Sequence, residues 1–137
     1  MKVFLDSSAL VKRYIEEPGS DRVAVICAAA EELAVSVVCV TEVLSACNRL
    51  LREKKITAKQ YAWIKNEFLL DIAEFFVIEL TAEVVGRSVT CLEKGAVRSL
   101  DALHIASALE SGCTRFVTGD ERQRGVAGKM GLKDEFV

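Results

Sequence analysis

The sequence alternates short, wholly apolar runs with longer segments of helical periodicity, and this alternation constrains the fold more than any other feature. The first run, Val3-Phe-Leu5, lacks polar alternation and is typical of a strand buried on both faces of a parallel sheet. No tight hairpin turn joins two such runs, so the strands must be connected through helices by right-handed crossovers. The pattern therefore predicts an α/β fold with a central parallel sheet.

Apolar runs, helical spacing and capping residues predict the individual elements. Strands are expected at residues 3–5, 33–40, 75–80 and 115–118, with a last edge strand over 132–137. Helices are expected over residues 9–15, 20–32, 42–55, 57–74, 81–95 and 99–111, with a short final helix after residue 120. The expected N-caps are Ser7 or Ser8, Thr57, Thr81 and Ser99. The order of the strands does not follow from this pattern.

Size and composition limit the classes of protein. A chain of 137 residues with 51% hydrophobic and 28% charged residues is expected to form one soluble domain over residues 1–137. Its net charge of −2 implies that nucleic-acid binding would depend on a local basic patch or a bound metal. We expect no membrane span and no signal peptide. The five cysteines form no C-x-x-C pair, which predicts free thiols in a reducing cytoplasm.

Four acidic residues stand where the predicted topology would bring them together. Asp6, Glu42 and Asp120 each come shortly after a predicted strand, and Asp101 opens a predicted helix. Each acid alone has an ordinary explanation as a helix N-terminal or loop residue. The joint pattern is more informative, because the carboxyl ends of parallel strands share one edge of the sheet. We therefore expect the four carboxylates to converge.

Converging carboxylates repel one another unless protons or cations compensate them. Oxygen ligands without a cysteine or histidine cage suit Mg²⁺ or Mn²⁺ better than Zn²⁺. Such ions lower the pKa of a bound water and stabilise the transition state of phosphoryl transfer, and one ion or two could act. The neighbouring hydroxyls of Ser7, Thr41 and Thr118 could orient a carboxylate or a water. Local backbone capping explains these hydroxyls equally well.

Read together, these acids and their neighbours resemble the PIN-domain family of metal-dependent ribonucleases. More narrowly, the chain is similar to the VapC toxins of bacterial and archaeal toxin–antitoxin pairs. The matching segments are Val3-Phe-Leu-Asp-Ser-Ser-Ala9, Val40-Thr-Glu-Val-Leu44, Arg98-Ser-Leu-Asp-Ala-Leu-His-Ile-Ala106 and Phe116-Val-Thr-Gly-Asp-Glu-Arg122. No single segment is very specific, but all four occur in the family order and cover essentially the whole chain.

The resemblance implies a three-layer α/β/α fold with a central parallel sheet of about five strands. It also implies Mg²⁺-dependent endonucleolytic cleavage of RNA, with Mn²⁺ able to substitute, an antitoxin partner and a homodimer. Asp6, Glu42, Asp101 and Asp120 would be the metal-binding, catalytic acids. The supporting residues would be Thr118, Ser7 and, less directly, Glu121.

Several other residues have two interpretations. His104 could be a general base, but a histidine packed or hydrogen-bonded on the inner helix face is the simpler interpretation. Tyr61, Trp63 and Phe68 could stack on RNA bases, but their helical spacing favours a core or partner-facing stripe. The family comparison points to a hydrophobic antitoxin groove to which Leu10, Val11 and Tyr14 would contribute. The cations that could bind the RNA backbone are Lys12, Arg13, Arg98, Arg122 and Arg124, and scattered solvated charge is the alternative.

Two other functions stay open at this stage. An aspartyl phosphatase of the haloacid-dehalogenase type would use Asp6 as its nucleophile. That chemistry normally requires a second acid two residues later, where Ser8 stands. A non-catalytic PIN-like module would bind RNA or a protein without cutting, but the intact acids argue against it.

Overall fold

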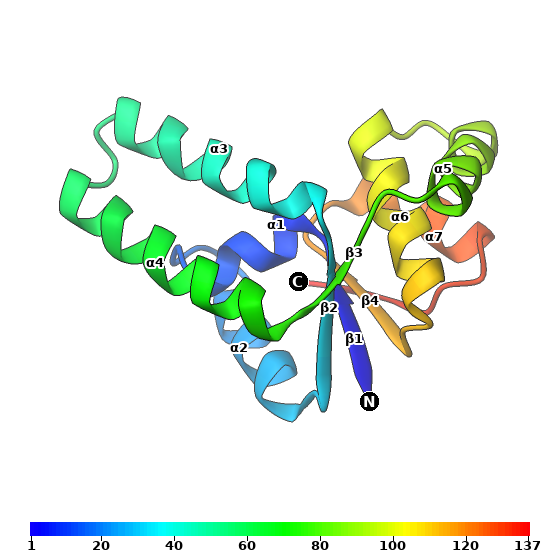
Figure 1. Cartoon of the computed structure of the whole chain (residues 1–137), viewed down its shortest axis with the longest axis horizontal. Coiled ribbons are helices and arrows are strands. Elements are labelled where there is room, and N and C mark those ends of the chain that lie inside the picture. The colour runs from blue at the N-terminus through cyan, green and yellow to red at the C-terminus, as the bar shows by residue number, and fades with distance from the viewer.

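The computed structural model describes residues 1–137 and contains one five-stranded sheet with helices on both sides (Figure 1). The strands are β1 (Lys2–Leu5), β2 (Glu32–Ser36), β3 (Phe76–Ile78), β4 (Arg115–Thr118) and β5 (Asp134–Phe136). Every neighbouring pair is parallel, in the order β3-β2-β1-β4-β5. The predicted parallel sheet of about five strands is confirmed.

The helices follow the predicted segments closely. They are α1 (Ser7–Leu10), which continues as the 3₁₀ turn η1 (Val11–Arg13), α2 (Ser20–Ala29), α3 (Val38–Arg52), α4 (Ala58–Glu74), α5 (Ala82–Lys94), α6 (Ser99–Ser111) and α7 (Glu121–Lys129). Thr57 and Thr81 cap α4 and α5 through their side chains, as predicted. None of the helices combines the length and the apolar character that a membrane crossing requires.

The two faces of the sheet are covered by different helices, which makes the predicted three layers. Helices α1 to α4 lie on one side and α5 to α7 on the other (Figure 1). Val3 and Leu5 of β1 pack into the core beneath the first group, whereas Phe4 points to the second. On that second side, Phe4 stacks on Phe116 of β4 with the ring centroids 5.9 Å apart. Burial on both faces explains why residues 3–5 of this strand are all apolar.

The end of β2 differs from the prediction. The strand stops at Ser36, and residues 38–40 form the first turn of α3 rather than its continuation. Cys39, Val43 and Cys47 recur every four residues and are all buried, so helical packing overrides the β propensity of the valines. Glu42 therefore lies in the second turn of a helix and not directly after a strand.

Two predicted N-caps were wrong. Asp6 caps α1, and Ser7 and Ser8 are already helical. Ser99 is the first residue of α6, and there the Asp101 carboxylate accepts a hydrogen bond from the Arg98 N–H at 3.3 Å. In both helices an acid of the candidate site occupies the capping role, because a carboxylate accepts from free N–H groups and is favoured by the helix dipole.

The strand order defines where a ligand site can form. β2 and β3 add to one side of β1, and β4 and β5 add to the other, so the order reverses between β1 and β4. In open parallel sheets, ligands bind outside the carboxyl ends of the strands at such a reversal. The loops that follow Leu5 and Thr118 leave the sheet at this point, where the Asp6 N–H donates to the Val117 carbonyl at 3.1 Å.

Candidate active site

Asp6 is the buried centre of the candidate site. Its side chain is fully inaccessible, and each carboxylate oxygen has fixed donors. Oδ1 accepts from the Ala9 N–H at 2.9 Å and from the Ser8 hydroxyl at 2.7 Å, and Oδ2 accepts from the Thr118 hydroxyl at 2.6 Å. Burial raises the pKa of Asp6, although nearby His104 and these donors oppose the rise. The carboxylate is thus rigidly held but poorly compensated in charge.

Two hydroxyls tie the end of β1 to the end of β4. Thr118, predicted as a supporting residue, also accepts from the Asp120 N–H at 2.9 Å. Ser8, which the sequence analysis did not select for the site, accepts from the Gly119 N–H at 2.9 Å. A Cβ on Gly119 would lie 2.9 Å from Cε of Lys12. The close approach of these segments is therefore part of how the site is built.

Glu42 reaches the same edge from α3. Its Oε1 accepts from the Ser7 hydroxyl at 2.9 Å and is hydrogen-bonded to Nε2 of His104 on α6. Burial acts to raise the pKa of Glu42, but the hydrogen bonds from His104 and Ser7 outweigh it, and the pKa is lowered. Ser7 therefore contacts an acid of the candidate site, and its supporting role stays a prediction.

Asp101 and Asp120 open α6 and α7 at the outer part of the site. Asp101 Oδ1 accepts from the side-chain amide of Gln123 at 3.1 Å. Burial raises the pKa of Asp101, and the negative charge of Asp120 adds to the rise. Burial also acts to raise the pKa of Asp120, but the hydrogen bonds and charge of Arg122 reverse this and lower it. The Arg122 Nη2 lies 3.2 Å from Asp120 Oδ2.

The four acids share one edge of the sheet but do not form a ready-made metal cage. No group of three or more histidine, cysteine, aspartate or glutamate side chains is arranged to hold an ion. The four acids do not form one shared metal centre in the structure, because each is hydrogen-bonded to its own donors in the protein. The donor chemistry nevertheless fits Mg²⁺: the ligands are all carboxylate oxygens, and Asp6 and Asp101 carry charge that burial makes unfavourable. An ion would compete with Arg122 for Asp120, whereas His104 and Ser7 bind only Oε1 of Glu42.

Two further residues predicted near the site, Glu121 and Thr41, lie on the surface. Glu121 is exposed, and its carboxylate pairs with Arg124 at 3.2 Å rather than joining the acids. Thr41 is exposed as well. Arg124 also binds Asp134, with Nε and Oδ2 2.5 Å apart. Glu121 and Arg124 therefore belong to ion pairs on the surface of α7.

Of the five predicted RNA-binding cations, two are near the acids and three, Arg124 among them, are engaged elsewhere. Arg98 and Arg122 are exposed, and their charges lower the pKa of Asp120. Lys12 is bound to the Pro18 carbonyl at 2.7 Å and to Glu17 at 3.3 Å. Arg13 pairs with Asp71 of α4 at 2.9 Å. RNA contact by Lys12 or Arg13 would require these interactions to open.

Besides Ser8, the sequence analysis missed the part that His104 and Gln123 have in the site. His104 is packed and hydrogen-bonded on the inner face of α6, as the simpler interpretation had it, but its partner is Glu42. Each residue lies three positions after an acid, His104 after Asp101 and Gln123 after Asp120. On a helix that spacing places side chains on the same face, so it could have indicated both residues.

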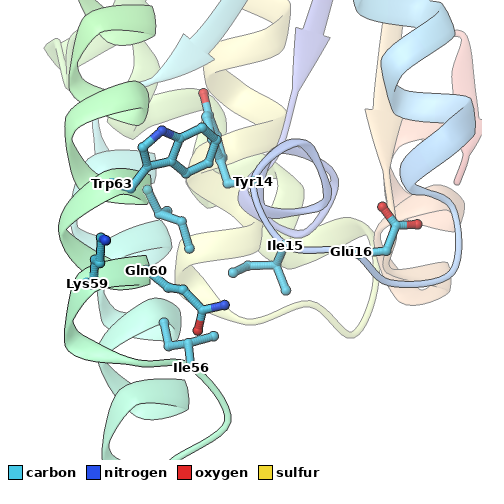
Figure 2. A pocket seen from close by; sticks show the side chains of 8 residues that line it. Tyr14, Ile15, Glu16, Ile56, Lys59, Gln60 and Trp63 are labelled. Atoms are coloured by element: carbon cyan, nitrogen blue, oxygen red, sulfur yellow. The ribbon is translucent and has the colours of Figure 1, made fainter.

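An apolar groove lies between the α1–α2 connection and α4. Its volume is about 430 Å³, and it is lined by Tyr14, Ile15, Glu16, Ile56, Lys59, Gln60, Trp63 and Ile64. We call it the helical groove. Trp63 and Gln60 of α4 face Tyr14 and Ile15 across it (Figure 2). Trp63 is 61% exposed, whereas Leu10 and Phe68 belong to the core. The predicted aromatic stripe is therefore divided between the interior and the groove.

Comparison with known proteins identifies the family. A model of the PIN domain matches residues 3–129. The chain belongs to the PIN domain family. No curated protein matches the sequence.

Solved structures share the PIN fold at low sequence identity. FitAcB from Neisseria gonorrhoeae superposes with a TM-score of 0.72 at 14% identity, over 98% of this chain and 96% of its own. VapC20 from Mycobacterium tuberculosis, a Sarcin-Ricin loop cleaving toxin, gives a TM-score of 0.70 at 14% identity, over 95% of each chain. A toxin–antitoxin complex from Klebsiella pneumoniae gives 0.67 at 16% identity, over 88% of each. At such identities the likeness concerns the fold alone.

Proposed function

We propose that this PIN-domain protein is a Mg²⁺-dependent endoribonuclease and the toxin of a VapBC-type toxin–antitoxin pair. The single observation that carries the proposal is Asp6, a fully buried carboxylate at the reversal of strand order whose pKa is raised by burial. A buried acid without a directly bonded cationic partner is favourable only if a cation or proton joins it. Membership in the PIN family and structural likeness to toxins support the same conclusion.

Asp6, Glu42, Asp101 and Asp120 would hold the ion, and Mn²⁺ should substitute for Mg²⁺. When bound, Mg²⁺ would supply positive charge to the scissile phosphate and acidify a water. The protein's own residues would orient the ligands of the ion. Ser8 and Thr118 fix the orientation of Asp6 through both of its oxygens. Preorganised carboxylates need no rearrangement during the reaction, which is where such sites gain rate.

The substrate would be RNA held through its phosphates. The chain has a net charge of −2, so binding must depend on local cations. Arg98 and Arg122 are exposed beside Asp101 and Asp120 and would contact the backbone on either side of the cleaved bond. All five cysteines are free thiols, which is consistent with the reducing cytoplasm proposed as the site of action.

The antitoxin would occupy the helical groove. Its apolar lining and the 61% exposed Trp63 suit the apolar face of a partner helix. A homodimer also belongs to the proposal, and the candidate surface is on α5. There Val85, Val89 and Leu92 are 47%, 52% and 44% exposed at helical spacing. If α5 forms the dimer interface, Val89→Glu should sediment as a monomer while wild type sediments as a dimer.

The decisive experiment is cleavage of a structured RNA with Mg²⁺, with Mn²⁺ and with EDTA. Wild type is compared with Asp101→Asn and with Glu93→Gln, which removes a surface acid of α5. Circular dichroism confirms that all three fold. We expect metal-dependent cleavage by wild type and Glu93→Gln and none by Asp101→Asn. Full metal-dependent activity in Asp101→Asn would refute the assignment.

The non-catalytic alternative predicts a different result. A binding module would retain RNA on native gels but would never cleave it, even after removal of any bound antitoxin. The phosphatase alternative loses its basis in this geometry. The second acid that this chemistry requires is replaced by Ser8, whose hydroxyl donates to Oδ1 of Asp6 at 2.7 Å.

A further inference from the structure

His104 is buried, and one of its ring nitrogens is hydrogen-bonded to an acid of the candidate site. It lies on α6 with 1% of its surface exposed. Nε2 is hydrogen-bonded to Oε1 of Glu42 and lies 3.2 Å from the Ser7 hydroxyl. The other ring nitrogen, Nδ1, is buried without any partner. The ring is thus anchored to the protein's polar groups at its Nε2 end alone.

The direction of the hydrogen bond follows from the chemistry of its partner. An ionised carboxylate can only accept, so Nε2 of His104 must carry the hydrogen. The Ser7 hydroxyl donates to the same atom, Oε1, at 2.9 Å. Two donors therefore hold one oxygen of Glu42, and the other, Oε2, has no hydrogen-bond partner in the protein. This arrangement fixes the carboxylate while leaving one oxygen free.

The helix that carries His104 also carries Asp101, one turn earlier. Its inner face is packed firmly, since Ala102, Ile105 and Ala106 around the ring are fully buried. One rigid helix therefore presents one acid of the site and holds a second acid that comes from α3. The position of Glu42 relative to Asp101 is set through His104.

We propose that His104 is a positioning residue that holds Glu42 with Oε2 directed to a bound divalent cation. This inference rests on the proposed metal-dependent function, because it assigns a role within the same site. A purely structural role explains the geometry less well. An unpartnered buried Nδ1 is unfavourable for folding, and an apolar residue of similar size would avoid it.

The test measures metal binding directly, apart from cleavage. Mn²⁺ binding to the full chain is followed by electron paramagnetic resonance for wild type, His104→Leu and His104→Gln. His104→Leu should bind Mn²⁺ about 10 to 100-fold more weakly, the usual cost of losing a group that orients a ligand. In His104→Gln the side-chain amide can still donate to Oε1, so most of the affinity should return.

Thermal unfolding in EDTA separates positioning from packing. His104→Leu should lower the melting temperature only modestly, since it removes the hydrogen bond to Glu42 but also an unpartnered polar atom from the core. His104→Asn serves if the leucine variant does not fold, because its shorter amide stays polar but cannot reach Glu42. Its Mn²⁺ affinity should fall below that of His104→Gln. In a Glu42→Gln background, His104→Leu should cause little further loss.

The outcomes distinguish this inference from the proposed function. Wild-type binding of Mn²⁺ with unchanged affinity in His104→Leu or His104→Asn would overturn the role of His104 alone. Equal losses of affinity in the Gln and Asn variants would do the same. No Mn²⁺ binding by wild type would overturn both proposals together.

Discussion

The acid edge of the sheet and the helical groove are built on opposite physical plans. At the acid edge, charged side chains from distant segments are each held by fixed donors, many of them buried, such as Thr118 on Asp6 and His104 on Glu42. In the groove, apolar side chains remain open, and Trp63 alone is 61% exposed. The first surface suits the proposed chemistry, and the second suits the proposed partner.

The difference has an energetic reason. Buried carboxylates are costly without hydrogen-bond donors, so the fold itself must supply donors to the acid edge. Covering exposed apolar surface contributes about 25 cal/mol per Å² of favourable free energy. Because the groove is open in the free protein, this free energy is available to the binding of a partner. Catalysis and partner binding should therefore respond to different mutations.

The largest effect is expected for Asp6→Asn. The loss of a buried negative charge should reduce metal-dependent RNA cleavage by about 100-fold or more, the scale of removing one preorganised electrostatic group. Antitoxin binding, measured by calorimetry, should stay at the wild-type level because the groove is untouched. Weakened antitoxin binding in this variant would show that the two surfaces are not separate.

Trp63→Ala should give the reverse result. A well-packed aromatic anchor typically contributes about 2 kcal/mol or more to an interface, so the Kd for the antitoxin should rise about 30-fold. Cleavage by the free protein should be unchanged. Trp63→Phe is the matched control and should restore part of the affinity. If Trp63→Ala abolished cleavage while the fold was intact, the groove would have to be assigned to the substrate.

A smaller effect is expected for Gln123→Leu, which removes the amide that holds Asp101. Loss of such an orienting partner should reduce cleavage about 10-fold. Stability should change little, because the variant also removes the buried, unpartnered Oε1 of Gln123. Parallel cleavage assays and thermal melts check both statements, and a large fall in melting temperature would instead assign Gln123 to the core.

The smallest effects concern pH and stability without metal. The pKa of Asp101 in the folded protein is raised from its ordinary 3.8, so the protonated carboxyl stabilises the fold. This contribution is fully present below pH 3.8 and is lost as the pH rises through the folded pKa. The melting temperature of Asp101→Asn minus that of wild type should therefore become more positive from pH 3 to 7.

Glu42→Gln should show the opposite trend. The pKa of Glu42 is lowered from 4.5, so its stabilisation is present above that pH and is lost as the pH falls through the folded value. The melting temperature of Glu42→Gln relative to wild type should become more negative as pH rises. Trp63→Ala should give a difference that does not depend on pH. Parallel trends in all three variants would contradict the assigned pKa directions.

The arrangement of β1 illustrates what could be predicted from sequence. Val3-Phe-Leu5 has no polar residue, and such a run can only be buried on both faces. Asp6 directly after it was placed correctly at the carboxyl end of the strand. The end of β2 could not be predicted as well, because Val38 and Val40 favour strands locally, and only packing of α3 against the core makes them helical.

The sequence by itself determined the parallel α/β fold, the family and the positions of Asp6 and Asp120 beyond their strands, because these depend on local patterns of burial and on motif order. Only the tertiary structure decided which donor holds each acid. His104 meets Glu42 across 62 positions and Thr118 meets Asp6 across 112. It also turned Arg13 toward Asp71 and away from the acids. Hydrogen bonds between distant segments depend on the packing of whole helices, and no local pattern encodes them.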